Sequence, residues 1–499
     1  MALYTLSIGN LFATITVLGI TYLASNMVYN LYFHPLSQFP GPFLMRISRL
    51  PYIYRFTRGA LPYYMLEIHE KYGEVVRVAP NELAFANPAA WNDIQGHRTK
   101  GQLEMEKSAA FYKPIKGIET DIINADREEH GMIRRTLAHG FSEKALRDQQ
   151  PLIKKYVDLL VQRLRENCAD GTKALDMTAW YNFTTFDVIG DLAFGEPFGC
   201  LEESRYHSWV ATIFQMAHVG TFVQSLSFYP AIKAVLDAFV PFMEKMDKQR
   251  QGFLRLSRTK LQTRMTKFKE RPDLVEPLIR RKDEWGLTME KLQATCSILI
   301  IAGSETTATL LSGVTYFLMT NPDAMKRATD EVRSRFKTED EINFVTVNDL
   351  NFMNSCLSEA FRLYPPVAMG LPRVVPAGGA KICGHYIAEG NIVAVHHYAL
   401  YRRASVFKDP LEYHPERFLG DPRFANDSRD ALQPFHIGPR NCIGRKPSLA
   451  YVEMRTILAR MLWNFDLRIA DESRNFLDQR NFNLWEKGAL KTYLTPVVR

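Results

Sequence analysis

The sequence lacks closely spaced cysteines. Its 499 residues include six cysteines, and no two of them form a Cys-x-x-Cys pair. Zinc ribbons and disulfide-stapled secreted domains are built on closely spaced cysteines, so the spacing argues against both. Cysteines without such partners fit a reducing compartment that faces the cytosol.

The chain also lacks a visible domain boundary. It contains no Ser/Gly-rich linker, no low-complexity run and no internal repeat. Length alone would predict about three domains. Hydrophobic residues make up 46% of the sequence, which is enough to bury a large core.

Features that recognise nucleic acid are absent as well. The formal net charge of +8 is modest for this length. No recognition motif and no stripe of basic and aromatic residues accompanies it. We therefore expect no nucleic-acid partner.

Charged residues are missing from the first 45 positions, and Arg46 is the first Lys, Arg, Asp or Glu. Within this stretch, Leu11–Tyr29 is long enough to cross a bilayer as a helix. A cleaved signal peptide is the alternative, but it needs a basic first segment and a small-residue cleavage site, and neither is convincing here. Four arginines (46, 49, 55 and 58) precede the first acid, Glu67. The positive-inside rule then places the rest of the chain in the cytosol.

One cysteine lies in a loop punctuated by glycine and proline. Residues 434–444 read PFHIGPRNCIG and carry Cys442. A thiol so placed can be a buried apolar residue, a nucleophile or a metal ligand. Gly438 and Gly444 let the backbone turn tightly and approach a bulky partner, and backbone N–H groups in such a turn can stabilise a thiolate. Arg440 adds a cation suited to a carboxylate, so the surroundings favour the metal ligand.

The longest helical pattern covers residues 288–320. Thr288 is its expected cap, and Asn321-Pro322 follows its end. Residues 302–307 read AGSETT, which places a carboxylate, Glu305, and two threonines after an apolar run. Buried charge is costly unless it is paired or used. Hydroxyls that bond to the preceding turn can also open a helix, leaving room for water or a diatomic ligand.

The pattern Phe435-x-x-Gly438-x-Arg440-x-Cys442-x-Gly444 resembles the haem-binding loop of the cytochrome P450 family, and residues 302–307 resemble its oxygen-binding segment. The resemblance implies a mainly α fold with a smaller β region, in which one domain encloses haem b. It therefore overrides the length-based expectation of three domains. The implied division is a membrane anchor over 1–33, a proline-rich hinge over 34–46 and a monooxygenase domain over 47–499.

The resemblance also implies roles for individual residues. The Cys442 thiolate binds the iron, with Phe435 and Arg440 in the same haem-binding loop. Thr306 donates a hydrogen bond to bound dioxygen, and Glu305 helps to relay protons. The remaining expected haem contacts go to the propionates, and they come from His130, Arg134 and Arg373.

His130 and Arg134 are four residues apart and so share a helix face. For Arg134 the alternative is a surface ion pair with Glu128 or Glu129. The family also has a buried triad that supports the haem region, and it maps onto Glu359, Arg362 and Arg417.

Several segments are expected to line a substrate pocket. Residues 97–125 show no periodicity and read as a long loop, and the family covers its substrate with this segment. Its pocket candidates are Phe111 and Tyr112. Further candidates are Val367, Ala368, Met369 and Leu371, together with a turn near Asn483-Leu484-Trp485.

The cysteine loop departs from the family pattern at its end. Leu449-Ala450 come five and six residues after Gly444, which is later than usual, and Pro447 suits the first position of the next helix. No acidic residue lies between Ala431 and Val452, whereas Arg440, Arg445 and Lys446 are basic. This is either an ordinary solvated face or a docking surface for an acidic electron donor.

The implied function is a haem-thiolate monooxygenase that inserts one oxygen atom into a hydrophobic small molecule. Electrons come from NADPH through a separate flavoprotein, NADPH-cytochrome P450 reductase, because the chain has no flavin or nicotinamide motif. The expected location is the endoplasmic reticulum membrane, with a single pass and a cytosolic catalytic domain. The wording of residues 33–36 and 435–441 resembles fungal secondary-metabolism enzymes such as trichothecene-pathway hydroxylases. The alternatives are a haem-thiolate isomerase or dehydratase that uses no dioxygen, and a non-enzymatic haem sensor.

Overall fold

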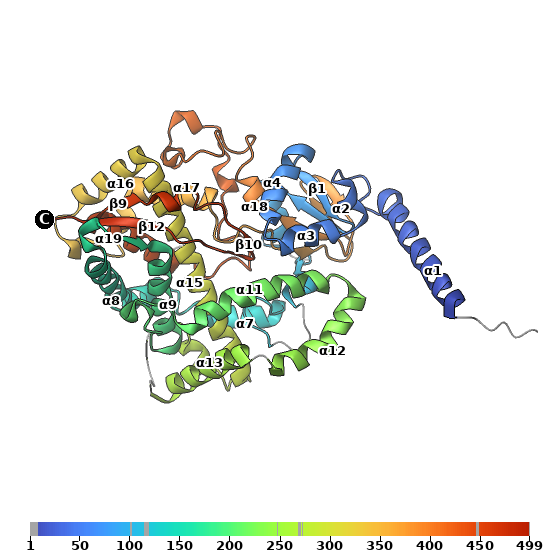
Figure 1. Cartoon of the computed structure of the whole chain (residues 1–499), viewed down its shortest axis with the longest axis horizontal. Coiled ribbons are helices and arrows are strands. Elements are labelled where there is room, and N and C mark those ends of the chain that lie inside the picture. Colours follow the sequence, from blue (N-terminus) through green and yellow to red (C-terminus); the bar gives the residue numbers. More distant parts are fainter. Residues whose placement is uncertain are drawn as a thin grey trace, which may run out of the picture.

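The computed structural model describes residues 8–99, 102–113, 119–246, 248–267, 271, 273–445 and 449–498. Helices dominate, as the sequence predicts, and the strands form small sheets (Figure 1). The helices are α1 Ile8–Val28, α2 Phe43–Ile47, α3 Leu50–Thr57, α4 Leu61–Tyr72, α5 Ala90–Gln95, α6 Ala109–Tyr112, α7 Arg127–Leu137, α8 Glu143–Asn167, α9 Met177–Phe194, α10 Cys200–Glu203, α11 Ser208–Ser227, α12 Pro230–Met246, α13 Lys248–Lys267, α14 Glu276–Arg280, α15 Met289–Thr320, α16 Pro322–Arg335, α17 Asn351–Leu363, α18 His397–Leu400 and α19 Leu449–Asn464.

The largest sheet has the strand order β1-β2-β8-β5-β3. Only its β2–β8 pair is parallel. The predicted strands around the Pro80-Asn81 turn are confirmed as β1 and β2. The strands are β1 Val75–Ala79, β2 Glu82–Phe85, β3 Glu106–Lys107, β4 Ala174–Asp176, β5 Arg373–Val374, β6 Ala380–Ile382, β7 His385–Ile387, β8 Ile392–Val395, β9 Phe465–Ile469, β10 Asn481–Phe482, β11 Leu484–Trp485 and β12 Lys491–Pro496.

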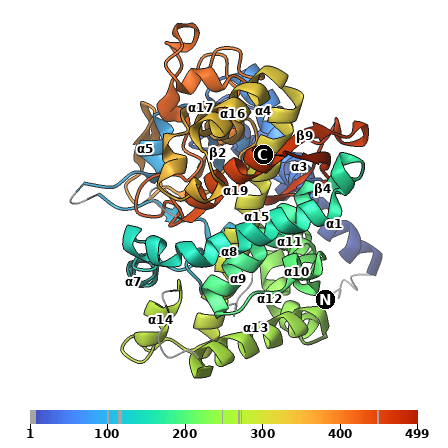
Figure 2. The ribbon, with the colours of Figure 1, turned by 90° about the vertical axis from the view of Figure 1, so that its left-hand side faces the viewer.

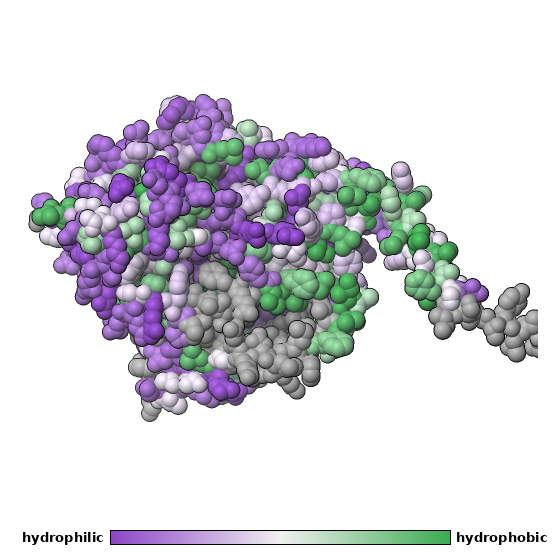
Figure 3. Space-filling view, viewed as in Figure 1, coloured by the Kyte–Doolittle hydropathy of each residue, from purple (hydrophilic) through white to green (hydrophobic). Residues whose placement is uncertain are grey.

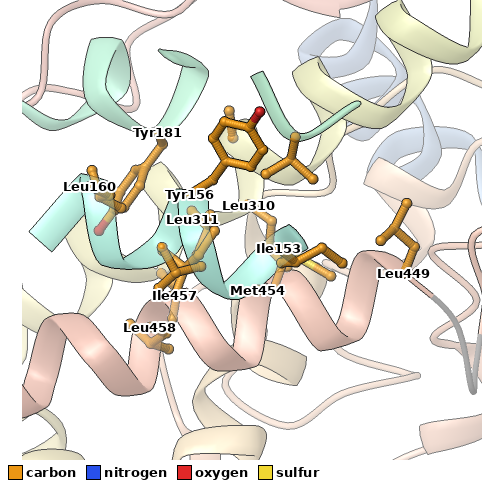
Figure 4. Close-up of a cluster of buried hydrophobic side chains, with 14 of the residues drawn as sticks. Ile153, Tyr156, Leu160, Tyr181, Leu310, Leu311, Leu449, Met454, Ile457 and Leu458 are labelled. Atoms are coloured by element: carbon orange, nitrogen blue, oxygen red, sulfur yellow. The ribbon is translucent and has the colours of Figure 1, made fainter. Parts of the chain in front are cut away.

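The helical core packs α8, α9 and α19 around α15, which runs through the middle of the molecule (Figures 1 and 2). Figure 4 shows buried side chains of α8, α9, α15 and α19 meeting in this core. The core continues into a second apolar cluster beneath the largest sheet. Leu66 and Leu432 pack against both clusters, so the two are not separate domains.

Helix α15 confirms the predicted long helix and its cap, because the Thr288 side chain accepts a hydrogen bond from the Lys291 N–H. The helix is unbroken from Met289 to Thr320, so the expected opening around residues 302–307 is not present. Gly303 instead has a packing role. A Cβ at this position would lie 2.8 Å from two carbons of the Ile189 side chain on α9.

The apolar N-terminal segment forms α1 and a short π-helix, Tyr29–Phe33, and it projects from the body (Figure 1). Among the described residues, two helices are long and apolar enough to span a membrane. The apolar part of Gly9–Phe33 is unburied, whereas Met289–Thr320 is largely buried in the core.

The proline-rich segment after the span is held against β1 rather than standing free. Leu36 and Phe39 are buried, and the Arg77 N–H donates to the Pro40 carbonyl at 2.7 Å. A Cβ on Gly41 would lie 2.3 Å from the Arg77 carbonyl oxygen. Only glycine therefore fits this close approach.

The expectation of an unstructured loop over residues 97–125 is wrong in part. Its described residues contain strand β3 and helix α6. Residues 100–101 and 114–118 lie outside the described part of the chain, as do Lys446, Pro447 and Ser448 of the later cysteine loop. Within the described residues, the helix after that loop begins at Leu449.

Candidate active site

A cavity of about 950 Å³ lies between α15 and the cysteine loop. The other described residues on its wall come from β3, α6, α7, α11, α12, α17, α19, residues 120–124 and 366–373, and the β10–β11 hairpin. Cys442, Phe435, Arg440, His130, Arg134, Arg373 and Thr306 all line it. The structure therefore brings together seven of the eight predicted site residues, and only Glu305 is absent from the lining.

The cysteine loop is shaped by a glycine and by its own backbone. Gly438 has a φ of +76°, and a Cβ there would lie 1.8 Å from the Gln95 carbonyl oxygen. The Cys442 N–H donates to the Phe435 carbonyl at 2.9 Å. Cys442 lies deep in the protein, and the surface that it exposes is wall of the cavity.

The chemistry of the Cys442 thiol depends on opposing effects. Burial raises its pKa, and a hydrogen bond from the Gly444 N–H and the nearby Arg134 cation offset only part of this rise. A cation and a backbone donor both favour the thiolate. The expected backbone donor to sulfur is therefore present.

Arg134 reaches from α7 to the cysteine loop. Its Nη1 donates to the Asn441 carbonyl at 2.5 Å, and its Nη2 donates to the side-chain oxygen of the same residue. The alternative of a surface ion pair with Glu128 or Glu129 is wrong, because Glu129 pairs instead with Lys291 at 2.5 Å. Arg134 is thus fixed beside Cys442.

Arg440 and Arg373 are buried near Arg134. Arg440 donates to Glu104 at 2.7 Å and to the Ala125 carbonyl at 3.0 Å. The Arg373 Nη1 lies 3.4 Å from the Met105 carbonyl, and its Nε has no hydrogen-bond partner in the described structure. An arginine N–H buried without a partner is costly, so Arg373 is poised for an acceptor.

The imidazole of His130 is neutral in these surroundings. Burial lowers its pKa to about 3, and the cations Arg440, Lys107, Arg134 and Arg373 act in the same direction. A neutral imidazole retains one N–H donor.

Two polar residues of this cluster were not assigned to it from the sequence. Burial, together with Arg373 and Arg440, lowers the pKa of Lys107 to about 7. Lys107 lies over the Tyr112 ring, and the buried Tyr112 hydroxyl has no hydrogen-bond partner among the described residues. Tyr112 was predicted to line a pocket, and it does. Nothing in the spacing of residues 97–125 distinguishes Lys107.

On the opposite wall, α15 presents Ala302 and Thr306 to the cavity. The Thr306 hydroxyl donates to the Ala302 carbonyl at 2.6 Å. This is the predicted hydrogen bond to the preceding turn. It leaves the oxygen lone pairs of Thr306 available to the cavity.

Glu305 lies on another face of α15. Its Oε2 accepts a hydrogen bond from Lys487 Nζ at 2.5 Å, and each side chain is 1% exposed. Lys487 Nζ also donates to the Thr309 hydroxyl at 3.0 Å, and Glu305 Oε1 has no partner in the described structure. Lys487 is 182 residues away along the chain. Sequence spacing therefore gave no sign of this pair.

The apolar walls follow the predicted segments closely. Val367, Met369, Leu371 and Arg373 line the cavity at alternate positions, as expected for extended chain. Ala368 was expected to face the substrate, but it is buried in the helical core.

The predicted C-terminal turn is the β10–β11 hairpin. Its Asn483 and Leu484 line the cavity. Trp485 does not, because it is buried and donates to the Pro365 carbonyl.

The predicted triad is confirmed as a buried ion network. Arg362 donates to both oxygens of Glu359 at 2.7 and 2.8 Å, and Arg417 Nε donates to it at 3.1 Å. All three side chains are fully buried. The network lies outside the cavity lining and links α17 to the segment before the cysteine loop.

Comparison with known proteins identifies the family of this chain. The family model described as Cytochrome P450 matches residues 38–490. The chain belongs to the cytochrome P450 family. It is a monooxygenase of this family, and membership implies a haem cofactor.

Three characterised relatives of this P450 are fungal and similar over nearly their whole length. Cytochrome P450 monooxygenase tpeC of Talaromyces stipitatus is 46% identical over 97% of this chain and 95% of its own. Cytochrome P450 monooxygenase prhB of Penicillium brasilianum is 44% identical, with 95% of this chain and 96% of its own covered. The trichothecene C-15 hydroxylase of Fusarium sporotrichioides is 42% identical, with 96% of each chain covered.

The residues around the cavity of this P450 fit a haem group. Lys107, Arg134, Arg373 and Arg440 form a cationic cluster near one wall, with unused donors on Arg373 and Tyr112. Two propionates would supply the missing acceptors. The Cys442 thiol lines the same cavity, where it could bind the haem iron.

The outer side of this cluster is basic. A second hollow of about 480 Å³ is lined by Arg98, Arg127, Arg135 and neighbouring histidines, with Glu104 as its acid. Arg445 is exposed on the cysteine loop. Arg440, predicted to lie on an exposed basic face, lines the inner wall of this hollow, but its side chain is only 5% exposed and pairs with Glu104.

Proposed function

We propose that this P450 is a membrane-anchored, haem-thiolate monooxygenase that hydroxylates or epoxidises a hydrophobic small molecule. The observation that carries the proposal is the position of Cys442 and Thr306 on the wall of one cavity. A thiolate ligand and a distal hydroxyl are the two groups that such chemistry needs on either side of haem b. When bound, haem supplies the iron at which dioxygen is activated.

Residues of the chain would bind haem b at two places, the iron and the propionate carboxylates. Cys442 would bind the iron as a thiolate, favoured by the Gly444 N–H and Arg134. Arg134, Arg373, Arg440 and the neutral His130 would hold the propionates. Phe435 contacts Phe361 and Tyr451, and so would keep the loop flat against the ring.

Thr306 and Glu305 would relay protons from solvent to the cavity. The Thr306 hydroxyl now donates to the Ala302 carbonyl, and it would turn toward the cavity to pass a proton there. Glu305 would supply these protons through its unpaired Oε1, because its Oε2 is held by Lys487. The Glu305–Lys487 pair would hold the carboxylate in a defined place between turnovers.

We propose that electrons come from NADPH through a flavoprotein, NADPH-cytochrome P450 reductase. Support comes from the basic surface formed by Arg98, Arg127, Arg135 and Arg445, which adjoins the cysteine loop. Surfaces of one sign steer partners of the opposite sign. An acidic reductase surface would therefore dock close to Cys442.

We propose that residues 1–33 anchor the protein in the endoplasmic reticulum membrane as a single pass, with residues 34–46 as the connector and 47–499 as the cytosolic domain. The unburied apolar α1 supports this location. Exposed apolar side chains on α2, α3, α11 and α12 extend the apolar surface toward α1 (Figure 3): Phe43, Leu44, Leu50, Tyr54, Val219, Phe222, Ile232, Val235 and Phe239. A hydrophobic substrate dissolved in the bilayer would lie close to this surface.

The pathway is proposed to be one of secondary metabolism, supported by the trichothecene C-15 hydroxylase among the relatives. The test is to incubate the enzyme and reductase with NADPH, isotope-labelled dioxygen and an extract from a strain in which this gene is deleted. One labelled oxygen atom in a new product would support the proposal. A product that forms equally well without dioxygen would contradict it and favour an isomerase.

A further inference from the structure

Most polar side chains on the cavity wall have an assigned partner or role. The cationic cluster faces the proposed propionates, and the Thr306 hydroxyl donates to the Ala302 carbonyl. Lys233 forms an ion pair with Asp237 at 3.0 Å. Four amides line the cavity: Asn441 accepts from Arg134 and Asn124 donates to Asp121, which leaves Gln224 on α11 and Asn483 on the β10–β11 hairpin. They are 259 residues apart along the chain and meet at the cavity.

The two amides form a short hydrogen-bonded chain. Asn483 Nδ2 donates to Gln224 Oε1 at 2.8 Å, and Gln224 Nε2 donates to the Phe111 carbonyl at 3.1 Å. Asn483 lies at the tip of the hairpin with a φ of +64°, a conformation that asparagine tolerates. The hairpin thus directs an amide, rather than a backbone corner, at the cavity.

These hydrogen bonds leave some donors and acceptors of the two amides without a partner. Each amide has two N–H donors and an oxygen with two lone pairs. Within the described residues, the bonds above are the only ones made by these two side chains, so one N–H on each and the whole of Asn483 Oδ1 are left over. Both side chains are partly exposed, so these groups are open to a ligand that enters the cavity.

The surrounding wall is apolar. Phe111, Leu484, Leu371 and Met369 come from the segments on either side of the amides, and Ile298 and Ile301 come from α15. These residues would bind hydrocarbon surface. A single polar pair in this setting fixes the orientation of a ligand.

We infer that Gln224 and Asn483 bind a carbonyl or hydroxyl oxygen on an otherwise apolar substrate. The spare N–H groups donate to a carbonyl, and Asn483 Oδ1 accepts from a hydroxyl. The substrate class is therefore an apolar skeleton that already carries one oxygen function, which makes the proposed oxidation a later step on a pre-oxidised compound. The inference rests on the proposed haem-thiolate function.

The test uses two commercial probes that share a carbon skeleton, the hydrocarbon valencene and its ketone nootkatone. Binding to the full-length haem enzyme is measured by the shift of the haem absorption band. The variants are Asn483→Gly, since glycine accepts the positive φ, and Gln224→Met, which keeps length and apolar packing. Each should weaken nootkatone binding by roughly fivefold to tenfold, the worth of one hydrogen bond. Valencene binding should change less than twofold.

Glu486→Gln is the matched control. Glu486 lies on the same hairpin and contacts His218 of α11 at 3.1 Å, but it is half exposed and outside the cavity lining. It should leave both affinities unchanged. An equal loss in Glu486→Gln would show that loosening the hairpin explains the effect, and would overturn the inference.

Other results also overturn it. These are equal effects on both probes, no effect on nootkatone, or no binding of either probe by an enzyme with a normal carbon-monoxide spectrum. If wild-type enzyme lacks that spectrum, the proposed function fails and the inference falls with it. The spectrum thus separates the two failures.

Discussion

Lys487 Nζ lies 2.5 Å from Glu305 Oε2, and only 1% of each side chain is exposed. The pair joins the C-terminal segment to the centre of α15. Removing one member of a buried ion pair leaves the other charge without compensation. Lys487 is therefore a structural partner of the one acid in the oxygen-binding segment.

Replacing Lys487 with methionine should lower the free energy of unfolding by about 3–5 kcal/mol, because Glu305 is left buried and unpaired. The double variant Lys487→Met, Glu305→Gln should recover much of this loss. Lys326→Met is the control, since its pair with Asp330 is 76% and 62% exposed. It should cost less than about 1 kcal/mol. Equal losses in Lys487→Met and Lys326→Met, measured by denaturant unfolding, would contradict the account.

Sequence reasoning found the features that depend on local pattern. The cysteine loop, the long helix with its Thr288 cap, and the apolar first segment are each written in consecutive residues. The Glu359 triad was found because its members lie in two recognisable motifs. For the triad, the family pattern supplied the pairing between residues that are far apart in the sequence.

Sequence reasoning missed contacts between residues that are far apart in the sequence and meet only in the folded structure. Lys487 and Lys107 reach their partners only through the fold, and neither lies in a recognisable motif. The packing role of Gly303 is also invisible in the sequence, because its neighbour Ile189 lies across a helix interface. Ala368 was misplaced because the register of an irregular segment is set by packing.

Thr306→Ala should impair coupling rather than folding. Loss of one well-placed catalytic hydrogen bond costs on the order of 3 kcal/mol, about a hundredfold in the chemical step. Haem content should persist, while more of the NADPH consumed ends as hydrogen peroxide. Ser312→Ala is the control, because Ser312 makes a similar bond to the Ala308 carbonyl at 2.8 Å but lies outside the cavity. Unchanged peroxide per NADPH with a lower melting temperature would make Thr306 a structural residue.

Glu453 on α19 should make stability fall as pH rises. It is 3% exposed, and burial raises its pKa to about 8. The unfolded chain loses this proton near pH 4.5 and the folded protein only near pH 8, so the folded state is destabilised progressively across that window. Glu453→Gln should therefore stabilise the protein by roughly 4 kcal/mol at pH 8. The gain should be small at pH 5.

Melting temperatures of the two proteins across this pH range provide the measurement. The exposed Glu472, replaced by glutamine, is the control and should shift stability little at either pH. A gain from Glu453→Gln that is the same at pH 5 and pH 8 would show that ionisation is not its cause.

The proposed topology predicts that protease added to sealed microsomes digests the domain after residue 46. It also predicts that Asn426, an exposed Asn-x-Ser sequon, carries no glycan. Asn182, in the other sequon, is uninformative in the folded protein because it is buried in α9. A glycan on Asn426, or protection from protease, would place the domain in the lumen.

The most direct test of the central claim is the carbon-monoxide spectrum of the reduced enzyme with Cys442 replaced by serine. Cys442 is the cysteine that the cavity exposes, whereas the partly buried Cys383 lies away from it. The account predicts that Cys442→Ser abolishes the red-shifted band of a thiolate-bound haem and that Cys383→Ser retains it. A red-shifted band that survives in Cys442→Ser, but is lost when another cysteine is replaced, would contradict the account.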